Sequence, residues 1–464
     1  MKPKDHQKRI AKKLEKQNGQ ILYWGLGSGK TYGAINAANE LGLNATVITP
    51  ASLQENFSKE VKGSRSDSNN FDVRSYDKYI RDPKSKFHDM LILDEAHKLR
   101  NPDTSRAKKL NAVSRSFGKR VLLTGTPIQD KPSELASLVN IASGEERLPT
   151  DAKTFNKMFI NSYTDYPTAY ARIFENAKPK HVVSLKNKKF LQQQIAGLVD
   201  YKDASENLGD YPVVNETSVT VNMTPDQVNS YNFYEQKLPI NLRRKLTTLG
   251  PLTGTEANKL NAFLSATRQI SNTNTRFGRV DATPKVQKVM DAVRKTKGPS
   301  LIYSNYLESG VYPIADAMDK EGIPYGLYTG ELDSTKKQAL VNDYNSGKLK
   351  ALLVSSSGGE GLDLKNTIAV HILEPHWNNP KLDQVIGRAI RYKSHSALPK
   401  KDRNVEVYKY LSKFPDEPTL LSEVGITTAR SNRVTADEYL YNVSKNKEKI
   451  NGLFLNLLKE EGKK

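Results

Sequence analysis

A glycine-rich segment near the start of the chain has the residue types of a phosphate-binding turn. It reads Gly25-Leu26-Gly27-Ser28-Gly29-Lys30-Thr31. Glycines adopt the positive φ angles that turn consecutive backbone N–H groups into one concave space, and such a space binds phosphate oxygens. We expect a phosphate to lie against Gly27, Ser28 and Gly29. Lys30 would add a positive charge there, and Thr31 would offer its hydroxyl to Mg²⁺. The alternative for this segment alone is an ordinary glycine turn between a strand and a helix.

A pair of acids further along the chain supplies the second half of an ATP site. The apolar run Met90–Leu93 leads directly into Asp94 and Glu95, which predicts two carboxylates at the carboxyl end of a buried parallel strand. We expect Asp94 to hold Mg²⁺ and Glu95 to polarise the water that attacks the γ-phosphate. His97 would link the nucleotide to a ligand bound elsewhere. The alternative is that the two acids are solvated residues at the start of a helix, where carboxylates are favoured. The glycine-rich segment makes an ATP site the preferred interpretation.

Two arginines could act on the same phosphate from another part of the chain. Arg388 and Arg391 lie three positions apart, which predicts one face of a helix. Arginines that stabilise a transferring phosphoryl group are worth about 10³ to 10⁵ in rate in related chemistry. The small-residue segment Ser355–Leu364 precedes them and would let a nucleic-acid backbone or a nucleotide approach closely. We assign its Gly361 and Asp363 to the nucleotide. Two surface arginines on an amphipathic helix are the alternative for an isolated pair.

The elements that position these residues alternate between apolar strands and helices, so the fold class predicted is α/β with two parallel-sheet lobes. The first lobe would span 1–145 and bind ATP, and the second would span 283–412. A mostly helical linker or protrusion is expected over 146–282, and a C-terminal helical brace over 413–464. The strands predicted for the second lobe are Ser300–Tyr303, Gly326–Tyr328, Ala351–Val354 and Ala369–Leu373.

Composition limits the class of protein. The 464 residues are enough for two or three domains, and cysteine is absent, so neither a disulfide framework nor a cysteine-ligated metal is expected. Lys and Arg total 71 against 51 Asp and Glu, a net charge of +20, which favours a polyanionic partner because neutralised phosphates release counterions. A lysine-rich solvated surface would give the same count. Apolar stretches are too short for a membrane span and the start does not resemble a signal peptide, so we expect a cytoplasmic protein without a membrane partner.

The order of these motifs resembles superfamily 2 helicases and translocases across nearly the whole chain. Within that superfamily, several segments look like the Swi/Snf branch of double-stranded DNA translocases. Others look closer still to helicase-like ATPases of large cytoplasmic DNA viruses, of the poxvirus nucleoside triphosphate phosphohydrolase type. The segments that carry the resemblance are His6-Gln7, Thr49-Pro50, the Asp94-Glu95-Ala96-His97 (DEAH) box with its tail to Asn101, Thr124–Pro127, Asn222–Gln227, Ala266–Ile270, Tyr303–Asn305, Gly358–Asp363, Gly387–His395 and Val434–Tyr441.

The resemblance implies two RecA-like lobes of a P-loop NTPase and further site residues. By carry-over, Gln7 would recognise adenine, while Trp24 stands where many such loops have their first small residue. The carry-over also implies contacts to a nucleic-acid backbone, which give affinity without base readout. These contacts are assigned to Thr49, Pro50, Thr124, Ser304, Asn305, Thr329, Gly330 and Ser355.

The resulting hypothesis is a monomeric motor that hydrolyses ATP with Mg²⁺ and moves along or remodels double-stranded DNA. Viral-type transcription, with transcription machinery as a partner, is the process implied by the resemblance, and the host cytoplasm or a virion is the location. One alternative is an RNA or single-strand unwinding helicase on the same scaffold. A second is a subunit of a transcription complex that binds nucleotide as a latch without hydrolysing it.

Overall fold

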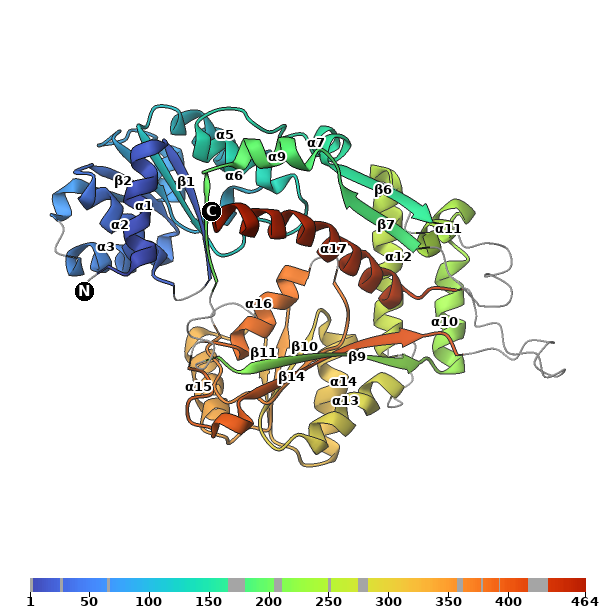
Figure 1. Ribbon diagram of the computed structural model, residues 1–464. Helices are drawn as coiled ribbons and strands as arrows, with labels where there is room; N and C mark the ends of the chain where they lie inside the picture. Colours follow the sequence, from blue (N-terminus) through green and yellow to red (C-terminus); the bar gives the residue numbers. More distant parts are fainter. Residues whose placement is uncertain are drawn as a thin grey trace. The chain divides into compact units, whose positions relative to one another are not determined.

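The computed structural model describes residues 3–25, 28–64, 67–165, 180–203, 211–248, 252–273, 283–356, 362–376, 379–391, 393–415 and 433–464. The chain forms two compact units (Figure 1). Unit 1 comprises Met1–Pro167, Pro179–Glu206 and Lys447–Lys464, and unit 2 comprises Thr168–Lys178 and Asn207–Asn446. Each unit holds a six-stranded sheet whose strands all pair in parallel. The predicted α/β class with two parallel-sheet lobes is confirmed.

The sheet of unit 1 has short central strands that are buried on both faces, as parallel strands require, and a half-buried edge strand, Phe71–Ser75. Its strand order is β3-β2-β4-β5-β1-β8. The strands are β1 (Gly19–Trp24), β2 (Ala45–Thr49), β3 (Phe71–Ser75), β4 (Met90–Leu93), β5 (Lys119–Thr124) and β8 (Val199–Lys202). The carboxyl ends of β1, β2, β4 and β5 therefore meet at one edge of the sheet, where the predicted ATP site was placed.

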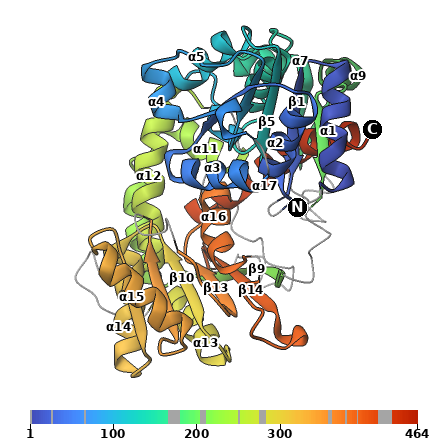
Figure 2. The same cartoon turned by 90° about the vertical axis from the view of Figure 1, so that its left-hand side faces the viewer.

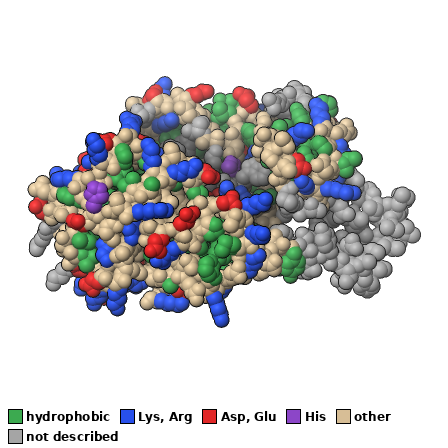
Figure 3. Space-filling model, turned by 90° about the horizontal axis from the view of Figure 1, so that it is seen from above, with side chains coloured by type: hydrophobic (Ala, Val, Ile, Leu, Met, Phe, Trp, Pro, Cys, Tyr) green, Lys and Arg blue, Asp and Glu red, His purple; other side chains and the backbone are tan. Residues whose placement is uncertain are grey.

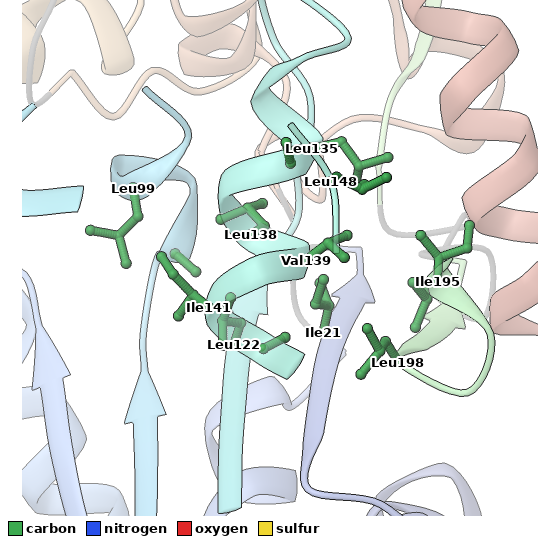
Figure 4. Packing of buried hydrophobic residues seen from close by; sticks show 14 of the residues in the cluster. Ile21, Leu99, Leu122, Leu135, Leu138, Val139, Ile141, Leu148, Ile195 and Leu198 are labelled. Carbon is green, nitrogen blue, oxygen red and sulfur yellow. The ribbon is translucent and has the colours of Figure 1, made fainter. Parts of the chain in front are cut away.

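Helices cover both faces of this sheet. One core packs side chains of α1, α2 and α3 against the strands, and the other packs α4, α5, α6, α7 and α9 against the opposite face. Figure 4 shows Leu138 and Val139 of α6 beside Ile21 of β1 and Leu122 of β5. The helices are α1 (Asp5–Lys16), α2 (Lys30–Glu40), α3 (Gln54–Gly63), α4 (Tyr76–Arg81), α5 (Ser105–Ser114), α6 (Glu134–Ser143), α7 (Ala152–Phe159) and α9 (Lys188–Ile195). The strands β6 (Ile160–Asp165) and β7 (Lys180–Leu185) form a separate antiparallel pair.

The sheet of unit 2 has the strand order β11-β12-β10-β13-β14-β9. Figure 2 shows β10, β13 and β14 side by side. The four strands predicted for this lobe are all present. The strands are β9 (Val213–Asn222), β10 (Ser300–Ser304), β11 (Tyr325–Tyr328), β12 (Ala351–Ser355), β13 (Ala369–Ile372) and β14 (Asn404–Lys413).

Unit 2 also has helices on both faces of its sheet, with a further helical cluster beside it. Side chains of α13 and α14 pack on one face, those of α15 and α16 on the other, and α10, α11 and α12 form the separate cluster with the start of α17. The helices are α10 (Pro225–Glu235), α11 (Ile240–Thr248), α12 (Gly254–Asn272), α13 (Pro284–Lys295), α14 (Tyr312–Lys320), α15 (Ser334–Asn345), α16 (Asn379–Ala389) and α17 (Ala436–Gly462).

Two segments are organised differently from the sequence-based expectation. The stretch 146–282, expected to be mostly helical, also contains β8, which joins the sheet of unit 1, and β9, which joins the sheet of unit 2. The helix α17 was expected to brace the second lobe. Its first turns do pack in unit 2 through Tyr439 and Leu440, whereas Phe454 and Leu457 lie in the core of unit 1.

Within the described ranges, no helix combines the length and apolarity that crossing a membrane would require. On the face drawn in Figure 3, Lys and Arg side chains are spread widely among the other side chains. This distribution fits the net charge of +20, and no basic stripe stands out among the described residues on this face.

Candidate active site

The glycine-rich segment joins the end of β1 to the start of α2. Of its residues, Gly25, Ser28 and Gly29 are described, and the predicted site residue Gly27 lies outside the described ranges. Gly29 has a φ of 76°, and a Cβ there would lie 2.5 Å from Nε2 of Gln7. Glycine is therefore required at position 29 by both its backbone conformation and its surroundings. The Ser28 hydroxyl donates to the Gly25 carbonyl over 2.7 Å, which tightens the turn.

The ammonium of Lys30 lies under the turn. Its Nζ donates to the carbonyls of Trp24 (3.0 Å) and Gly25 (3.1 Å). Desolvation by burial lowers the pKa of Lys30, and the negative charges of Glu95 and Asp94 oppose that shift. Lys30 thus lies within electrostatic range of both acids, and phosphate oxygens would offer it stronger acceptors than neutral carbonyls do. Thr31 follows in the first turn of α2 and is half-buried.

Asp94 follows the last residue of β4, and only 8% of its surface is exposed. Its Oδ2 accepts a hydrogen bond from the Thr49 hydroxyl (2.8 Å), and its Oδ1 accepts one from the Glu95 amide (3.0 Å). Desolvation raises the pKa of Asp94, and the bond from Thr49 partly offsets the rise. A poorly solvated carboxylate with few protein partners gains by binding a cation.

Glu95 has a left-handed backbone with a φ of 50°. This conformation is uncommon for a residue with a side chain, and such strain is concentrated at functional sites. His97 Nδ1 lies 2.9 Å from Oε2 of Glu95. The imidazole is the largest cause of a lowered pKa at Glu95, which keeps the carboxylate ionised. His97 therefore lies beside Glu95, while its role in linking two ligands stays a prediction.

The residues present fit a magnesium ion. Mg²⁺ keeps several waters and usually binds through one or two carboxylates together with substrate phosphates. Asp94 and the hydroxyl of Thr31 would supply such a set. In the part of the chain that the structure describes, no group of three or more His, Asp or Glu side chains is arranged to hold a metal by itself. A dedicated protein cage for a metal is therefore not observed there.

The first helix contributes to the same site. Gln7 of α1 donates from Nε2 to the carbonyl of Gly29 (3.1 Å) and accepts at Oε1 from the Lys4 amide (2.8 Å). The preceding His6 places Nε2 3.0 Å from the carbonyl of Ser28. Gln7 is 5% exposed, so its predicted contact with adenine would require its amide to serve the loop and the base together.

Arg100 joins the acid box to the Thr124–Pro127 segment, a contact that sequence reasoning did not identify. Its guanidinium donates to the His97 carbonyl (2.8 Å), the Thr126 carbonyl (3.0 Å) and the Gln129 side chain. Helix α17 continues this chain of contacts within unit 1, because Asn451 donates to the Gln129 carbonyl (3.0 Å). The planar fork of arginine suits three acceptors in this way. Nothing in the local sequence pattern indicates these partners.

Trp24 is accommodated at the phosphate turn by a buried carboxylate. Its Nε1 donates to Oδ1 of Asp200 over 2.7 Å, and Arg9 and Lys13 of α1 pair with the same carboxylate at 2.6 and 3.1 Å. Asp200 belongs to β8 and is fully buried. The tryptophan therefore packs beneath the turn and ties β1 to α1 and β8, and the turn itself is left to the glycines.

Most of the predicted nucleic-acid contacts are buried side chains. Thr49 and Thr124 are 0% exposed in unit 1, and Pro50 is also buried. The hydroxyl of Thr49 is used by Asp94, and that of Thr124 accepts the Thr126 amide (3.1 Å). In this conformation these side chains do not present a polar group to a phosphate. Their role at a nucleic acid stays a prediction that would depend on backbone groups.

In unit 2, the corresponding residues converge on a buried acid. Glu374 accepts hydrogen bonds from the Ser304 hydroxyl (2.6 Å) and from the Asn305 amide (2.9 Å) and side chain (3.2 Å). Ser304 is 1% exposed, Ser355 2% and Thr329 9%. Gly330 is exposed and Asn305 is half-buried. Of this predicted set, Gly330 and Asn305 have the access that a phosphate contact requires.

The two predicted arginines do not share a helix face. Helix α16 ends at Ala389, so Arg388 is in its last turn and Arg391 lies beyond it. The helix prediction was wrong at this end, because the chain leaves the helix at Ile390 and turns through 393–398. Arg391 Nη1 instead lies 3.1 Å from Oδ1 of Asp363. Arg391 and Asp363, both predicted for the nucleotide site, are thus in contact. Gly361, predicted for the same site, lies outside the described ranges.

A cavity of about 880 Å³ in unit 2 involves none of these residues. It lies between α13 and the strand β14, where Lys288, Lys295, Tyr408 and Tyr410 are among its lining residues. Its lining also includes Pro299, Ile368 and Asn404, at the amino ends of the strands β10, β13 and β14, whereas open parallel sheets bind their ligands at the carboxyl ends. The predicted site residues therefore remain the candidates for nucleotide chemistry.

Comparison with known proteins gives the family. Residues 14–276 match the SNF2-related domain, and residues 284–393 match the helicase conserved C-terminal domain. A protein of Acanthamoeba polyphaga mimivirus, provisionally named an ATP-dependent RNA helicase, is 33% identical over 96% of this chain and 94% of its own. A termination factor NPH-I homolog of African swine fever virus is 24% identical over 96% of this chain and 76% of its own.

Among solved structures, the Pyrococcus furiosus Hef helicase domain superposes with a TM-score of 0.49 at 13% identity, covering 89% of this chain and 95% of that one. The domain matches, the viral relatives and the arrangement of Lys30, Asp94 and Glu95 around one strand edge agree with one another. The resemblance predicted from the motifs is confirmed: the chain belongs to the SNF2-related family of helicase-like ATPases, and it carries the helicase conserved C-terminal domain.

Proposed function

We propose that this chain hydrolyses ATP in unit 1 and couples the hydrolysis to movement along, or remodelling of, double-stranded DNA. The observation that carries the ATP site is the arrangement of Lys30 below the glycine turn, close enough to Asp94 and Glu95 for both to act on its pKa. A cation for the phosphates, an acid to hold Mg²⁺ and an acid to orient and deprotonate the water are groups that phosphoryl transfer to water uses.

In the proposed reaction, ATP binds with its phosphates against the glycine turn, and Lys30 moves its hydrogen bonds from backbone carbonyls to phosphate oxygens. Glu95 accepts a proton from the water as the water oxygen bonds to the γ-phosphorus and the bond to the ADP oxygen breaks. Asp94 and Thr31 would hold Mg²⁺, which supplies charge that offsets the phosphate oxygens. Arg388 and Arg391 of unit 2 would stabilise the transferring phosphoryl group.

The proposal of a DNA substrate rests on the family and on charge. SNF2-related domains are the larger match, and a net charge of +20 favours a phosphate backbone as partner. We further propose that the process is viral-type transcription with transcription machinery as a partner, since one relative bears the name termination factor. A single chain is proposed to suffice for the motor.

A second candidate function has specific support. A viral relative is provisionally named an ATP-dependent RNA helicase, and contacts to a phosphate backbone do not by themselves distinguish DNA from RNA. Under this candidate, the same ATP site would drive unwinding of RNA or of a single-strand junction. The third candidate function is a subunit that binds nucleotide as a latch without hydrolysing it. The acid pair Asp94 and Glu95 argues against this candidate.

The deciding experiment measures ATP hydrolysis by the full chain with duplex DNA, single-stranded DNA or RNA. The expected result is stimulation by duplex DNA above that by the other two, together with displacement of a triplex-forming strand from duplex DNA. Glu95→Gln should retain ATP binding and lose roughly 10² to 10⁴ in rate, the usual contribution of a general base. Glu55→Gln, an exposed acid on α3 paired with Lys59, is the matched control.

Normal turnover by Glu95→Gln would overturn the assignment of the base. Stimulation by RNA alone would overturn the DNA proposal and support the RNA candidate. Absence of hydrolysis by the wild-type chain with all three nucleic acids would favour the latch.

A further inference from the structure

Two consecutive carbonyls of the phosphate turn are held by two consecutive residues of α1. His6 Nε2 lies 3.0 Å from the carbonyl oxygen of Ser28, and Gln7 Nε2 donates to the carbonyl oxygen of Gly29 over 3.1 Å. Both side chains are at least nine-tenths buried. The first turn of α1 therefore holds the peptide plane of the Ser28 carbonyl, and it shares the Gly29 carbonyl with the Gly33 amide of α2, which donates to it over 2.9 Å.

The orientation of these planes decides where the amides of the turn point. In a trans peptide the C=O of one residue and the N–H of the next are antiparallel, and no cis peptide bond is found in the described ranges. Because the carbonyls of Ser28 and Gly29 point to α1, the N–H groups of Gly29 and Lys30 point away from it. These are the first amides of α2, which have no carbonyl partner within the helix and suit an anion.

Lys202 sets the tautomer of His6, the residue that bonds to the Ser28 carbonyl. Its Nζ lies 3.1 Å from Nδ1 of His6. An ammonium donates and does not accept, so Nδ1 must be the acceptor. The ring hydrogen then lies on Nε2, where it is donated to the Ser28 carbonyl. The ring itself packs edge-on against Trp24, with centroids 4.9 Å apart.

The backbone of Lys202 acts on the same turn. Its carbonyl accepts the amide of Gly25 at 3.1 Å, so the turn is attached to Lys202 at its first residue and, through His6, at Ser28. Lys202 is the last residue of β8, the edge strand that pairs with β1. This strand contributes none of the predicted motif residues, and the sequence around Lys202 gives no sign of a role at the nucleotide.

We propose that Lys202 is a positioning residue for nucleotide binding, acting through His6 to hold the amide of Gly29 toward the phosphates. The inference rests on the proposed ATP site and deepens it. Lys202 does not touch the nucleotide in this scheme. Its ammonium fixes the tautomer and tilt of His6, His6 fixes the Ser28 carbonyl, and the peptide plane turns the amide toward its ligand.

The test compares Lys202→Met, which keeps the length of the side chain and removes its donor, with Lys202→Arg, which restores a donor. The probes are a fluorescent ADP analogue with Mg²⁺ for binding and ATP for steady-state hydrolysis. Lys202→Met should weaken ADP binding and raise KM for ATP roughly tenfold while kcat changes little, the pattern expected when binding shared by ground and transition states is lost. Lys202→Arg should recover most of the affinity.

A matched control and a double variant separate positioning from general destabilisation. Lys119→Met removes a lysine that donates to the Gln17 carbonyl and the Asn18 side chain at the amino end of β5, opposite the turn, and should leave nucleotide affinity unchanged. His6→Phe keeps a ring beside Trp24 but loses both nitrogens. If Lys202 acts through His6, combining His6→Phe with Lys202→Met should add little to His6→Phe alone.

Unchanged ADP affinity in Lys202→Met, or additive losses in the double variant, would overturn the inference while wild-type hydrolysis still supports the ATP site. Equal losses of ADP affinity in Lys202→Met and Lys119→Met would likewise overturn it, because the weaker binding would then reflect a general loss of stability in unit 1. Wild-type protein that binds neither ADP nor ATP would instead contradict the proposed function.

Discussion

The hydroxyl of Thr49 donates to Oδ2 of Asp94 over 2.8 Å, joining the carboxyl ends of the neighbouring strands β2 and β4. Thr49 is 0% exposed and Asp94 8%. A residue that the resemblance assigns to nucleic acid is therefore bound to the acid proposed to hold Mg²⁺. Thr49 thus stabilises the ionised form of Asp94, since a hydrogen bond to a carboxylate lowers its pKa.

Thr49→Val should increase the Mg²⁺ requirement of the ATPase. Valine has the shape of threonine without the donor, so the pKa of Asp94, already raised by desolvation, should rise further. Protons then compete with Mg²⁺ more strongly, and more so at lower pH. The expected change is roughly tenfold in the Mg²⁺ concentration for half-maximal activity, the value of one hydrogen bond to a charged group. Mg²⁺ titrations near pH 6 and pH 8 check it.

Nucleic-acid titrations of Thr49→Val distinguish a role of Thr49 at Asp94 from a role at DNA. If Thr49 acts on DNA rather than on Asp94, the variant should show weaker stimulation by duplex DNA with an unchanged Mg²⁺ requirement. Thr46→Val is the matched control, because the Thr46 hydroxyl is also buried in β2 but donates to the Phe87 carbonyl (2.8 Å), away from the acids.

His97→Ala should move the acid limb of the ATPase pH profile to higher pH. The pKa of Glu95 is lowered chiefly by the neighbouring imidazole, so Glu95 stays ionised to a lower pH than an isolated glutamate. Removing the imidazole raises that pKa, and the fraction of ionised base begins to fall at a higher pH as acid is added. The measurement is kcat at saturating ATP over the acidic range.

An acid limb that stays in place in His97→Ala would show that Glu95 does not set it. His88→Ala is a suitable control, since His88 is exposed and stacks on Phe117 at a ring distance of 5.3 Å, away from the acids.

His371 should make the stability of unit 2 depend on pH. It is fully buried in β13, where its Nδ1 lies 3.0 Å from the Tyr410 hydroxyl, and desolvation lowers its pKa to about 3. The unfolded chain binds the proton at its ordinary pKa of about 6.5. Between these values the unfolded state holds more protons, so stability is complete above the unfolded pKa and falls by about 1.4 kcal/mol per unit of pH below it.

Hydrogen exchange of β13 peptides between about pH 5 and pH 7 measures this slope. His371→Gln should flatten it, although the variant is expected to be less stable at neutral pH because the Tyr410 contact changes. His88→Gln should keep the wild-type slope. A slope that is the same in wild type and His371→Gln would assign the pH dependence to other groups.

The ion pair between Lys285 and Asp437 should be more sensitive to loss of one partner than to replacement of both. Their Nζ and Oδ2 atoms lie 2.7 Å apart, and the two side chains are 1% and 0% exposed. Lys285→Met alone leaves a buried carboxylate whose remaining donor among the described residues is the Ser412 amide, which should cost about 3 to 5 kcal/mol. The double variant Lys285→Met with Asp437→Leu should recover part of that loss.

Urea unfolding followed by the signals of unit 2 provides the free energies. The control is Lys348→Met, whose partner Asp343 is exposed, and whose loss should cost no more than about 1 kcal/mol. If the double variant is as unstable as Lys285→Met, the pair contributes net stability beyond the avoided cost of a lone charge.

The sequence predicted the local parts of the fold and site well. The strand Met90–Leu93 and its two acids were expected, because apolar runs leave a pattern within a few residues. The end of α16 before Arg391 was missed, since the i, i+3 spacing of two arginines does not reveal where a helix stops.

Contacts between residues far apart in the chain could not be predicted. The bond of Trp24 to Asp200 and that of Ser304 to Glu374 join strands through side chains separated by many residues. Such pairings depend on the order of strands in the sheet, which periodicity does not specify. For the same reason Thr49 was assigned to nucleic acid on resemblance, while its buried partner Asp94 was found only in three dimensions.

The division of α17 between two cores affects how the chain can be made. Phe454, Leu457 and Leu458 fill part of the core of unit 1, yet they follow the long stretch Asn207–Asn446 of unit 2 in the sequence. During synthesis, amino-terminal domains generally fold first. The apolar core of unit 1, however, cannot be completed until the residues of unit 2 have been translated.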